Sequence, residues 1–254
     1  MRTFSCQVCG QSVYFENSHC THCGATLGFL PDRLRLSAVE QGEDGLWRVP
    51  APRPAAAERA AAPSLFVRWF GRPPRSAGGS TPVTPPPPAA YRKCGNYEQH
   101  QVCNWMVPVD SGEAFCPACR PNQVIPNLAR PGNLDKWYRI ERSKRRLAYG
   151  LLRLGLPVRT KAEDPAGGLG FAFLSSLDAP PGEPVLTGHA DGLITINIDE
   201  ADAAARERMR VDLDEKYRTL LGHFRHEVGH YYWDLLIRDG GRLDDFRAGF
   251  GDER

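Results

Sequence analysis

Long apolar stretches are missing from this sequence. No run of about 18 apolar residues, close to the length a helix needs to cross a bilayer, occurs among its 254 residues. The opening residues Met-Arg-Thr-Phe-Ser-Cys also lack the apolar core of a secretion signal. We therefore expect a cytoplasmic protein that has no membrane partner.

An excess of charge of one sign is also missing. The chain has 32 Lys and Arg residues against 30 Asp and Glu residues. A nearly neutral chain gives no global electrostatic reason to bind nucleic acid or a membrane surface. Nucleic acid stays a weakly supported partner, since only a local feature could recruit it.

Cysteine is absent after residue 119, and all eight cysteines lie before residue 120. Three of their closest pairs have the spacing C-x-x-C. In a reducing compartment this spacing favours metal binding over disulfides. We therefore expect structural zinc in the first half of the chain.

The first cysteine unit, residues 1–30, has two C-x-x-C pairs separated by ten residues. Four thiolates complete a tetrahedral zinc site and leave no open position for chemistry. In so small a unit the metal must supply much of the folding energy. His19 and His22 lie beside the cysteines and are not needed. The predicted ligands are Cys6, Cys9, Cys20 and Cys23.

A second, less regular unit covers residues 91–125, with eight residues between its first two cysteines. A redox C-x-x-C is the alternative, which the lack of a surrounding βαβ pattern disfavours. Ribbons of this kind bind proteins or nucleic acid. The basic run Lys144–Arg146 could add a phosphate contact or form a solvated helix face. The predicted ligands are Cys94, Cys103, Cys116 and Cys119.

Between these units, residues 48–90 hold half of the 22 prolines. Such a segment buries too little apolar surface to fold alone, so we expect a semi-rigid linker. Its apolar island, Leu65–Phe70, is expected to fold back on the neighbouring domain, with docking on a partner as the alternative.

From residue 133 onwards the chain has an α/β pattern. Apolar residues at a spacing of three to four predict a helix over 133–154, capped by Asn133. Strands are predicted at 170–174, 185–187 and 193–198, with a hairpin turn at Asp191-Gly192. Helices are predicted at 200–210 and 215–238, the latter ended by Asp239-Gly240-Gly241.

The helix predicted at 215–238 contains the motif His226-Glu227-Val228-Gly229-His230. With about 100° per residue, the two histidines lie about 40° apart, one turn from each other. Two imidazoles so placed can share one zinc ion, and Glu227 can act as general base on a water. The motif also arises by chance on solvated helices. The opposite face is apolar here, which favours the metal site: Tyr217, Leu221, Phe224, Val228, Tyr231 and Leu235.

A catalytic zinc ion usually has three protein ligands and a water. Asp234 lies about 12 Å from His226 along a straight helix, and His223 about 10 Å from His230, so neither can join the pair. His223 is expected in the core or beside the site. Glu253 is a weak candidate for the third ligand.

The sequence resembles a family of bacterial zinc-binding metallopeptidases with an N-terminal zinc ribbon. Five stretches carry the resemblance: Phe4–Gly10, His22–Pro31, Cys103–Trp105, Thr187–Ile198 and Gly222–Asp234. It implies an α+β fold, with two small zinc-ribbon units before a zincin-like domain (133–254) that has a short sheet and the active-site helix. It also implies that family members continue past the position of Arg254, with a Trp- and Glu-rich helix as the source of the third ligand.

The leading hypothesis is a zinc-dependent peptidase acting on a peptide or protein, with one catalytic and one or two structural Zn²⁺ ions. Its ribbons would recognise a protein partner or position the enzyme. The strand at 193–198 could bind substrate as an edge strand or be an ordinary sheet strand. The alternatives are a non-catalytic ribbon protein with an incomplete peptidase domain and a nucleic-acid-binding ribbon protein.

Overall fold

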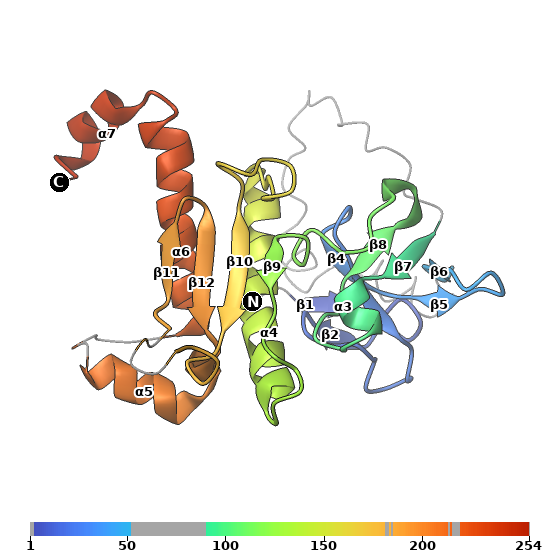
Figure 1. Cartoon of the computed structure of the whole chain (residues 1–254). Coiled ribbons are helices and arrows are strands. Elements are labelled where there is room, and N and C mark those ends of the chain that lie inside the picture. Colours follow the sequence, from blue (N-terminus) through green and yellow to red (C-terminus); the bar gives the residue numbers. More distant parts are fainter. Residues whose placement is uncertain are drawn as a thin grey trace, which may run out of the picture. The chain divides into compact units, whose positions relative to one another are not determined.

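The computed structural model describes residues 3–51, 90–180, 183, 185–212, 214 and 219–253. The chain has an α+β fold that divides into two compact units, Met1–Cys94 with Asn104–Ala114 and Gly95–Cys103 with Phe115–Arg254 (Figure 1). Most of the predicted linker, including its island at 65–70, lies outside the described residues. No described helix combines the length and the apolar character needed to cross a membrane.

The first unit is built from short antiparallel strands. Strand β1 (Thr3–Ser5) pairs with β2 (Ser12–Tyr14), and β3 (Leu27–Leu30) with β4 (Arg35–Ala38). A four-stranded sheet has the order β5 (Glu40–Gln41), β6 (Trp47–Arg48), β7 (Tyr91–Lys93) and β8 (Met106–Pro108), and the 3-10 turn η1 (Val109–Ser111) follows.

Aromatic rings form the small core of this unit. The ring centroid of Phe29 lies 4.5 Å from that of Trp105 and 5.0 Å from that of Phe15, and all three side chains are buried. Edge and tilted contacts of this kind add to the stabilisation that burial gives. Such short sheets nevertheless enclose little apolar volume, which leaves much of the stability to other sources.

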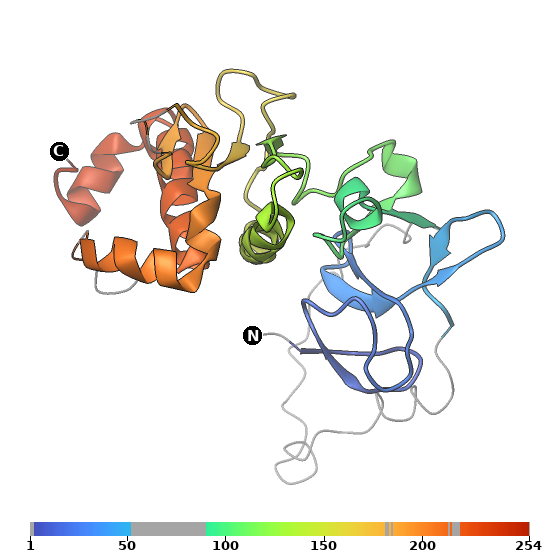
Figure 2. The ribbon, with the colours of Figure 1, turned by 60° about the horizontal axis from the view of Figure 1, so that its bottom comes forward.

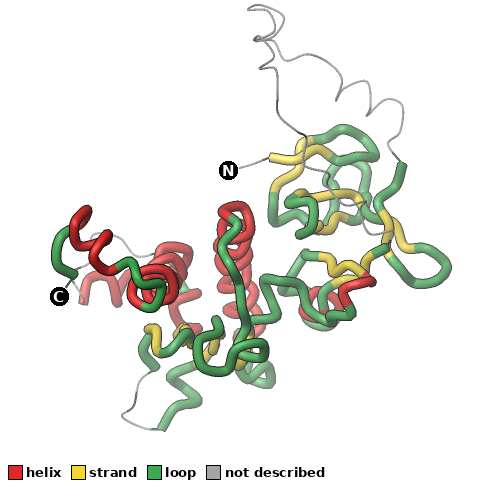
Figure 3. The backbone as a smooth tube through the Cα atoms, turned by 90° about the horizontal axis from the view of Figure 1, so that it is seen from above, coloured by secondary structure: helices red, strands yellow, loops and turns green. Residues whose placement is uncertain are grey.

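The second unit is a four-stranded sheet with helices on one face. The strand order is β11 (Gly188–Ala190), β12 (Leu193–Asn197), β10 (Gly170–Leu174) and β9 (Asn122–Val124). Strand β10 is parallel to β12 and β9, whereas β11 is antiparallel to β12. Figure 3 shows α4 (Asn133–Leu154) and α6 (Leu220–Trp233) on the same side of the strands.

The remaining helices of this unit are short. Helix α3 (Gly95–Glu98) precedes the sheet, and the 3-10 turn η2 (Ile198–Ala201) leads from β12 into α5 (Ala203–Asp212). A π-helical turn, η3 (Asp234–Arg238), continues α6 and leads to α7 (Leu243–Phe250), the last red helix before the C-terminus in Figure 2. π-helical turns are rare and frequently occur at functional sites.

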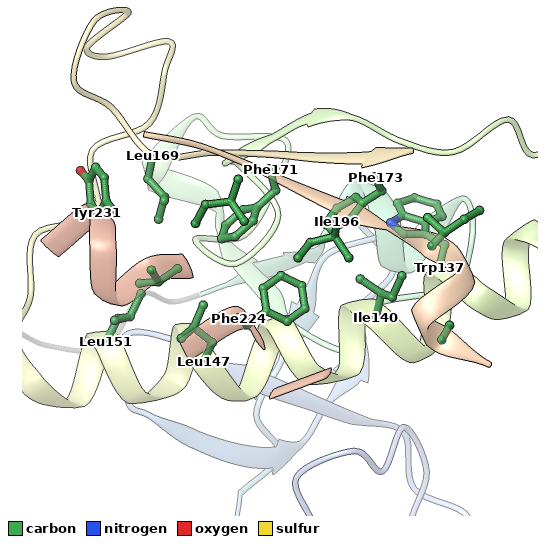
Figure 4. Close-up of a cluster of buried hydrophobic side chains, with 14 of the residues drawn as sticks. Trp137, Ile140, Leu147, Leu151, Leu169, Phe171, Phe173, Ile196, Phe224 and Tyr231 are labelled. Carbon is green, nitrogen blue, oxygen red and sulfur yellow. The ribbon is translucent and has the colours of Figure 1, made fainter. Parts of the chain in front are cut away.

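The core of the second unit fills the space between the sheet and the two long helices (Figure 4). From α4 come Trp137 and Ile140, which face Phe173 of β10. Phe224 of α6 closes the layer and packs edge-on against Phe171, with ring centroids 5.6 Å apart. Burying each such side chain contributes about 1.5–3 kcal/mol. The core therefore fixes one face of α6 and leaves its opposite face outside the core.

The predicted helix over 133–154 is confirmed, and it ends at Gly155, whose φ is 66°. The predicted cap is wrong, because Asn133 is the first helical residue. Its side-chain amide donates to the carbonyl of Asn127, and Gly132 precedes the helix with a φ of 83°. The start of α4 is thus set by a glycine turn and a contact with the preceding loop.

The predicted strand at 170–174 is confirmed, and the one at 193–198 ends at Asn197. Asp191 and Gly192 form the predicted turn, with φ of 47° and 81°, as a type I′ hairpin requires. The strand predicted at 185–187 is wrong, since the pairing covers 188–190. The turn fixes the register, which places Gly188 opposite Thr195, the last pair of the hairpin.

The two predicted C-terminal helices have different starts from those expected. The side chain of Asp202 accepts from the backbone N–H of Ala204, so α5 begins at 203 and not at 200. Residues 215–218 lie outside the described part. Thr219 has an extended backbone and its hydroxyl accepts from the N–H of Gly222, so α6 begins at Leu220.

Two residues of the basic run 144–146 are buried in the second unit, so neither the phosphate contact nor the solvated face applies to them. The Nζ atom of Lys144 lies 2.7 Å from a carboxylate oxygen of Glu141 and 5.2 Å from the ring centroid of Phe173. Arg145 donates to the carbonyl of Val102. Both cations are therefore part of the packing beneath the sheet.

Candidate metal and catalytic centre

The first four predicted thiol ligands come together in the first unit, with their sulfur atoms within 4.8 Å of one another. The Sγ atoms of Cys6 and Cys23 are 3.7 Å apart, and those of Cys9 and Cys20 are 3.6 Å apart. Thiolates bound to one tetrahedral zinc ion at 2.3 Å are about 3.8 Å apart. The cluster therefore has the size of a zinc–thiolate site.

Glycines let the two C-x-x-C turns close. Gly10 and Gly24 have φ of 75° and 73°, a region that favours glycine. Their N–H groups donate to the carbonyls of Cys6 and Cys20 at 2.8 and 2.9 Å. Each turn thus folds back on its first cysteine and presents both of its thiols to the same point.

Backbone dipoles and burial act on these thiols in opposite directions. Burial raises the pKa of Cys9 to about 12. Burial also acts to raise the pKa of Cys20, but the backbone N–H groups of Cys23 and His22, together with the thiols of Cys9 and Cys23, lower that pKa to about 7. Without a cation, four adjacent thiols cannot all ionise at neutral pH, because their charges repel. A bound metal ion removes this penalty.

The other four predicted thiol ligands also form a cluster, in which every member is buried. The sulfur atoms of Cys103 and Cys116 are 3.8 Å apart, and the N–H of Cys119 donates to the carbonyl of Cys116 at 2.8 Å. Cys94 completes the group within the same 4.8 Å limit. Both clusters fit zinc ribbons. Neither His19 nor His22 belongs to a four-residue group among the described residues.

The two histidines of the motif meet on the exposed face of α6. The Nε2 atoms of His226 and His230 are 3.1 Å apart, and both side chains are exposed. Two nitrogen ligands at 2.0–2.1 Å from one tetrahedral zinc ion are about 3.3 Å apart. The buried opposite face, with Phe224, Val228 and Tyr231, holds the helix in this orientation.

Glu227 is half-buried, one residue beyond His226. No group of three possible metal-binding side chains that includes both motif histidines occurs among the described residues. The carboxylate of Glu253 lies 2.6 Å from Arg247, and that of Asp234 lies 2.8 Å from Arg238. The weak candidate Glu253 is thus held by an arginine in this structure.

His223 contacts a buried carboxylate, and its expected role beside the metal site stays a prediction. Its Nδ1 atom lies 2.5 Å from Oε2 of Glu200, a carboxylate with 2% of its side chain exposed. The hydroxyl of Thr187 donates to the other oxygen, Oε1, at 2.6 Å. These three residues, called the Glu200 tether below, connect the first turn of α6 to η2 and to the residue before β11.

His189, which was not among the predicted site residues, lies beside His230 of the motif. Its ring is parallel to that of His230, with an interplanar angle of 8° and centroids 6.3 Å apart. The N–H of Gly192 donates to its Nε2 atom at 3.0 Å. Burial lowers the pKa of His189, and the negative charge of Asp234 opposes this in part.

A signal for His189 was present in the sequence. In the hairpin closed by Asp191-Gly192, residue 189 stands opposite Ile194. Ile194 is fully buried on the helix side of the sheet. Side chains of directly opposed residues point to the same face, so the predicted turn already directs His189 towards the helices.

The chain is similar in sequence to known families and proteins. Residues 133–254 match a family model described as "Putative zinc-binding metallo-peptidase", and residues 3–61 and 81–130 match a zinc-ribbon domain. Uncharacterized proteins of Mycobacterium bovis and Mycobacterium tuberculosis are 35% identical over 253 residues, which is 99% of this chain and 59% of each relative. The chain thus spans about three fifths of these relatives.

No solved structure gives a significant match. The two matched regions cover nearly all of the described residues. Residues 133–254 are therefore similar to the "Putative zinc-binding metallo-peptidase" family, and the N-terminal part of the chain is similar to a zinc-ribbon domain.

Proposed function

We propose that the second unit hydrolyses peptide bonds in a zinc-dependent reaction centred on α6. The observation that carries the proposal is the 3.1 Å separation of the Nε2 atoms of His226 and His230 on the exposed face of a helix whose other face is buried. This is the spacing at which both nitrogens hold one zinc ion. The match to the metallo-peptidase family supports it.

Zinc, when bound, is a Lewis acid that makes water nucleophilic at neutral pH. Glu227 follows His226 directly, so its carboxylate lies beside the metal-binding face. We assign it two proton transfers: it takes a proton from the attacking water and later gives one to the amine nitrogen of the breaking C–N bond. His226 and His230 stay neutral in this scheme, because a ligand imidazole needs a free lone pair.

The substrate peptide is proposed to pair with β11. The strand at 193–198 that the sequence suggested for this role lies inside the sheet, hydrogen-bonded to β11 and β10, so it cannot accept a further strand. Strand β11 is an edge of the sheet and is in contact with α6. An extended peptide added to this edge would lie along the motif helix.

We also propose two structural zinc ions, one in each four-thiol cluster, in addition to the catalytic one. The closed ligand sets leave no open position, so their role is folding and presentation of a surface. A protein partner is the proposed target of that surface, because the near-neutral chain offers little attraction for nucleic acid.

A non-catalytic binding or regulatory protein is the second candidate. It is favoured by one observation, that no third ligand joins His226 and His230 among the described residues. A site with two protein ligands would bind zinc less tightly than one with three, and it would orient the attacking water less well.

Cleavage of a peptide library, read by mass spectrometry, separates the two candidates. This chain and the longer Mycobacterium tuberculosis relative are each assayed as isolated, with a chelator, and after zinc is restored. We expect cleavage that the chelator abolishes and zinc restores. Zinc-loaded proteins that cleave no peptide would contradict the peptidase and favour the binding protein.

A further inference from the structure

His189 occupies a position from which it can reach a peptide bound at the motif. It lies on the edge strand β11 and faces the helix side of the sheet, as its partner Ile194 does. Its ring is parallel to that of His230. The residue therefore lies between the proposed substrate strand and the proposed metal ligands.

The hairpin fixes which nitrogen of His189 carries the proton. Because the N–H of Gly192 donates to Nε2 at 3.0 Å, Nε2 uses its lone pair as an acceptor. A neutral imidazole has one N–H and one lone pair, so the proton is on Nδ1. The same contact occupies the lone pair that Nε2 would need to bind zinc, which argues against His189 as a ligand through that atom.

The position of Gly192 is itself tightly constrained. Its φ is 81°, and a Cβ atom there would lie 2.3 Å from the carbonyl oxygen of Gly168. The residue must therefore be glycine, and the fixed turn keeps its N–H directed at Nε2 of His189. At the other end of β11, the Glu200 tether connects the residue before the strand to the first turn of α6 through Thr187 and His223. The tether thus holds the N-terminal end of the strand to the motif helix.

We propose that His189 is a catalytic residue, whose Nδ1–H donates a hydrogen bond to the carbonyl oxygen of the scissile peptide. This inference rests on the proposed function. When water adds to the carbonyl carbon, its proton passes to Glu227 and the carbonyl oxygen gains negative charge. A donor aimed at that oxygen stabilises the transition state more than the bound peptide. The charge leaves the oxygen when the C–N bond breaks and Glu227 protonates the nitrogen.

Nitrogen NMR of the labelled imidazoles tests the tautomer without any activity. We expect His189 to show a protonated Nδ1 and an unprotonated, hydrogen-bonded Nε2, in the metal-free and in the zinc-loaded protein. A proton on Nε2, or a shift of Nδ1 to that of a metal-bound nitrogen when zinc is added, overturns the proposal.

Two variants test the donor. His189→Phe keeps the ring and removes both nitrogens, whereas His189→Asn places an amide N–H close to the position of Nδ1. We expect His189→Phe to lower kcat about 100-fold, within the range for loss of one such donor, with zinc content and KM unchanged. His189→Asn should recover about tenfold of this loss, as a weaker donor of similar reach.

Binding of a phosphinic peptide, which imitates the charged transition state, gives a second readout by calorimetry. Its affinity for His189→Phe should fall by the same factor as kcat, while the affinity for a substrate peptide stays constant. The control is His100→Phe, in the same unit beside Trp137 and away from the motif, which should change neither value. Unchanged kcat in His189→Phe, or loss of zinc from it, overturns the proposal.

Failure of the proposed peptidase function and failure of the His189 role give different results. If the zinc-loaded wild-type chain neither cleaves peptides nor binds the phosphinic peptide, the proposed function fails and the role of His189 fails with it. If the wild type does both and His189→Phe does both equally well, only the role of His189 fails.

Discussion

Glu200 shows how a buried carboxylate can set the position of the helix that carries the His226–His230 motif. Only 2% of its side chain is exposed, and its two oxygens contact His223 of α6 and Thr187 before β11. Its backbone carbonyl accepts from Arg206 of α5 at 2.6 Å. Three segments that are far apart in the sequence are therefore joined through one residue.

Replacement of Glu200 by alanine removes the hydrogen-bond acceptor of Thr187 and the carboxylate that contacts His223. Because truncating one partner of a buried pair leaves the other uncompensated, we expect the free energy of unfolding to fall by about 3 kcal/mol. Denaturant titration measures this. Glu207→Ala, which removes an exposed ion pair with Arg210, is the control and should leave the unfolding midpoint unchanged. Equal midpoints for both variants would show that the tether is not stabilising.

Lys144 gives a second test at the scale of one residue. Lys144→Ala leaves the fully buried Glu141 without its cation, and we expect a loss of about 3–5 kcal/mol in unfolding free energy. The double variant Lys144→Met, Glu141→Leu should recover most of the loss, since it removes both charges. Arg139→Ala breaks an exposed pair with Asp135 on the same helix and should cost less than about 1 kcal/mol. A double variant as unstable as Lys144→Ala would contradict this account.

At the scale of elements, the hairpin of β11 and β12 determines where His189 lies. Gly192→Ala places a Cβ atom 2.3 Å from a backbone oxygen in a left-handed conformation, so the turn must move. We expect a lower melting temperature and loss of the Gly192 contact to His189, seen as a changed imidazole nitrogen shift. Gly188→Ala is the matched control on the same hairpin. It has nothing within 4 Å of its Cβ and should leave both values unchanged.

Local sequence patterns predicted the positions of helices and turns better than the tertiary contacts between them. The helix at 133–154 followed from apolar spacing, and the turn at Asp191-Gly192 from residues that accept a positive φ. Both depend on neighbours within a few positions. The buried state of Lys144 depends on Asn122 and the rings of β10, which are brought near only by the fold. Charge alone therefore gave the wrong environment.

In the candidate site, too, the local contacts were predictable from the sequence and the long-range contacts were not. His226 and His230 share one helix, so their 3.1 Å contact follows from the helix repeat. His189 and Glu200 reach α6 through strand pairing and a 3-10 turn, and their contacts cross 41 and 23 residues of sequence to His230 and His223 respectively. Which residues meet in such long-range contacts is decided by tertiary packing, and a single sequence does not reveal that packing.

At the scale of the whole molecule, the proposed function assigns one zinc ion to each four-thiol cluster and one to His226 and His230. We expect about three zinc ions per chain by elemental analysis, from one ion for each site of this kind. A His226→Ala, His230→Ala double variant should lose one ion with little change in the melting temperature, because both side chains are exposed. Cys20→Ser should lose one ion and unfold the first unit, since its core is small. A double variant that keeps all three ions would contradict the assignment to α6.

The reaction itself is tested most directly by one variant, Glu227→Gln, assayed for peptide hydrolysis with its zinc content measured in the same sample. Glutamine keeps the shape of the side chain and cannot take the proton from water. The account predicts wild-type zinc content and a loss of turnover, with peptide binding retained. Turnover that persists in Glu227→Gln at equal zinc content would contradict the central claim that this chain is a zinc peptidase acting through Glu227.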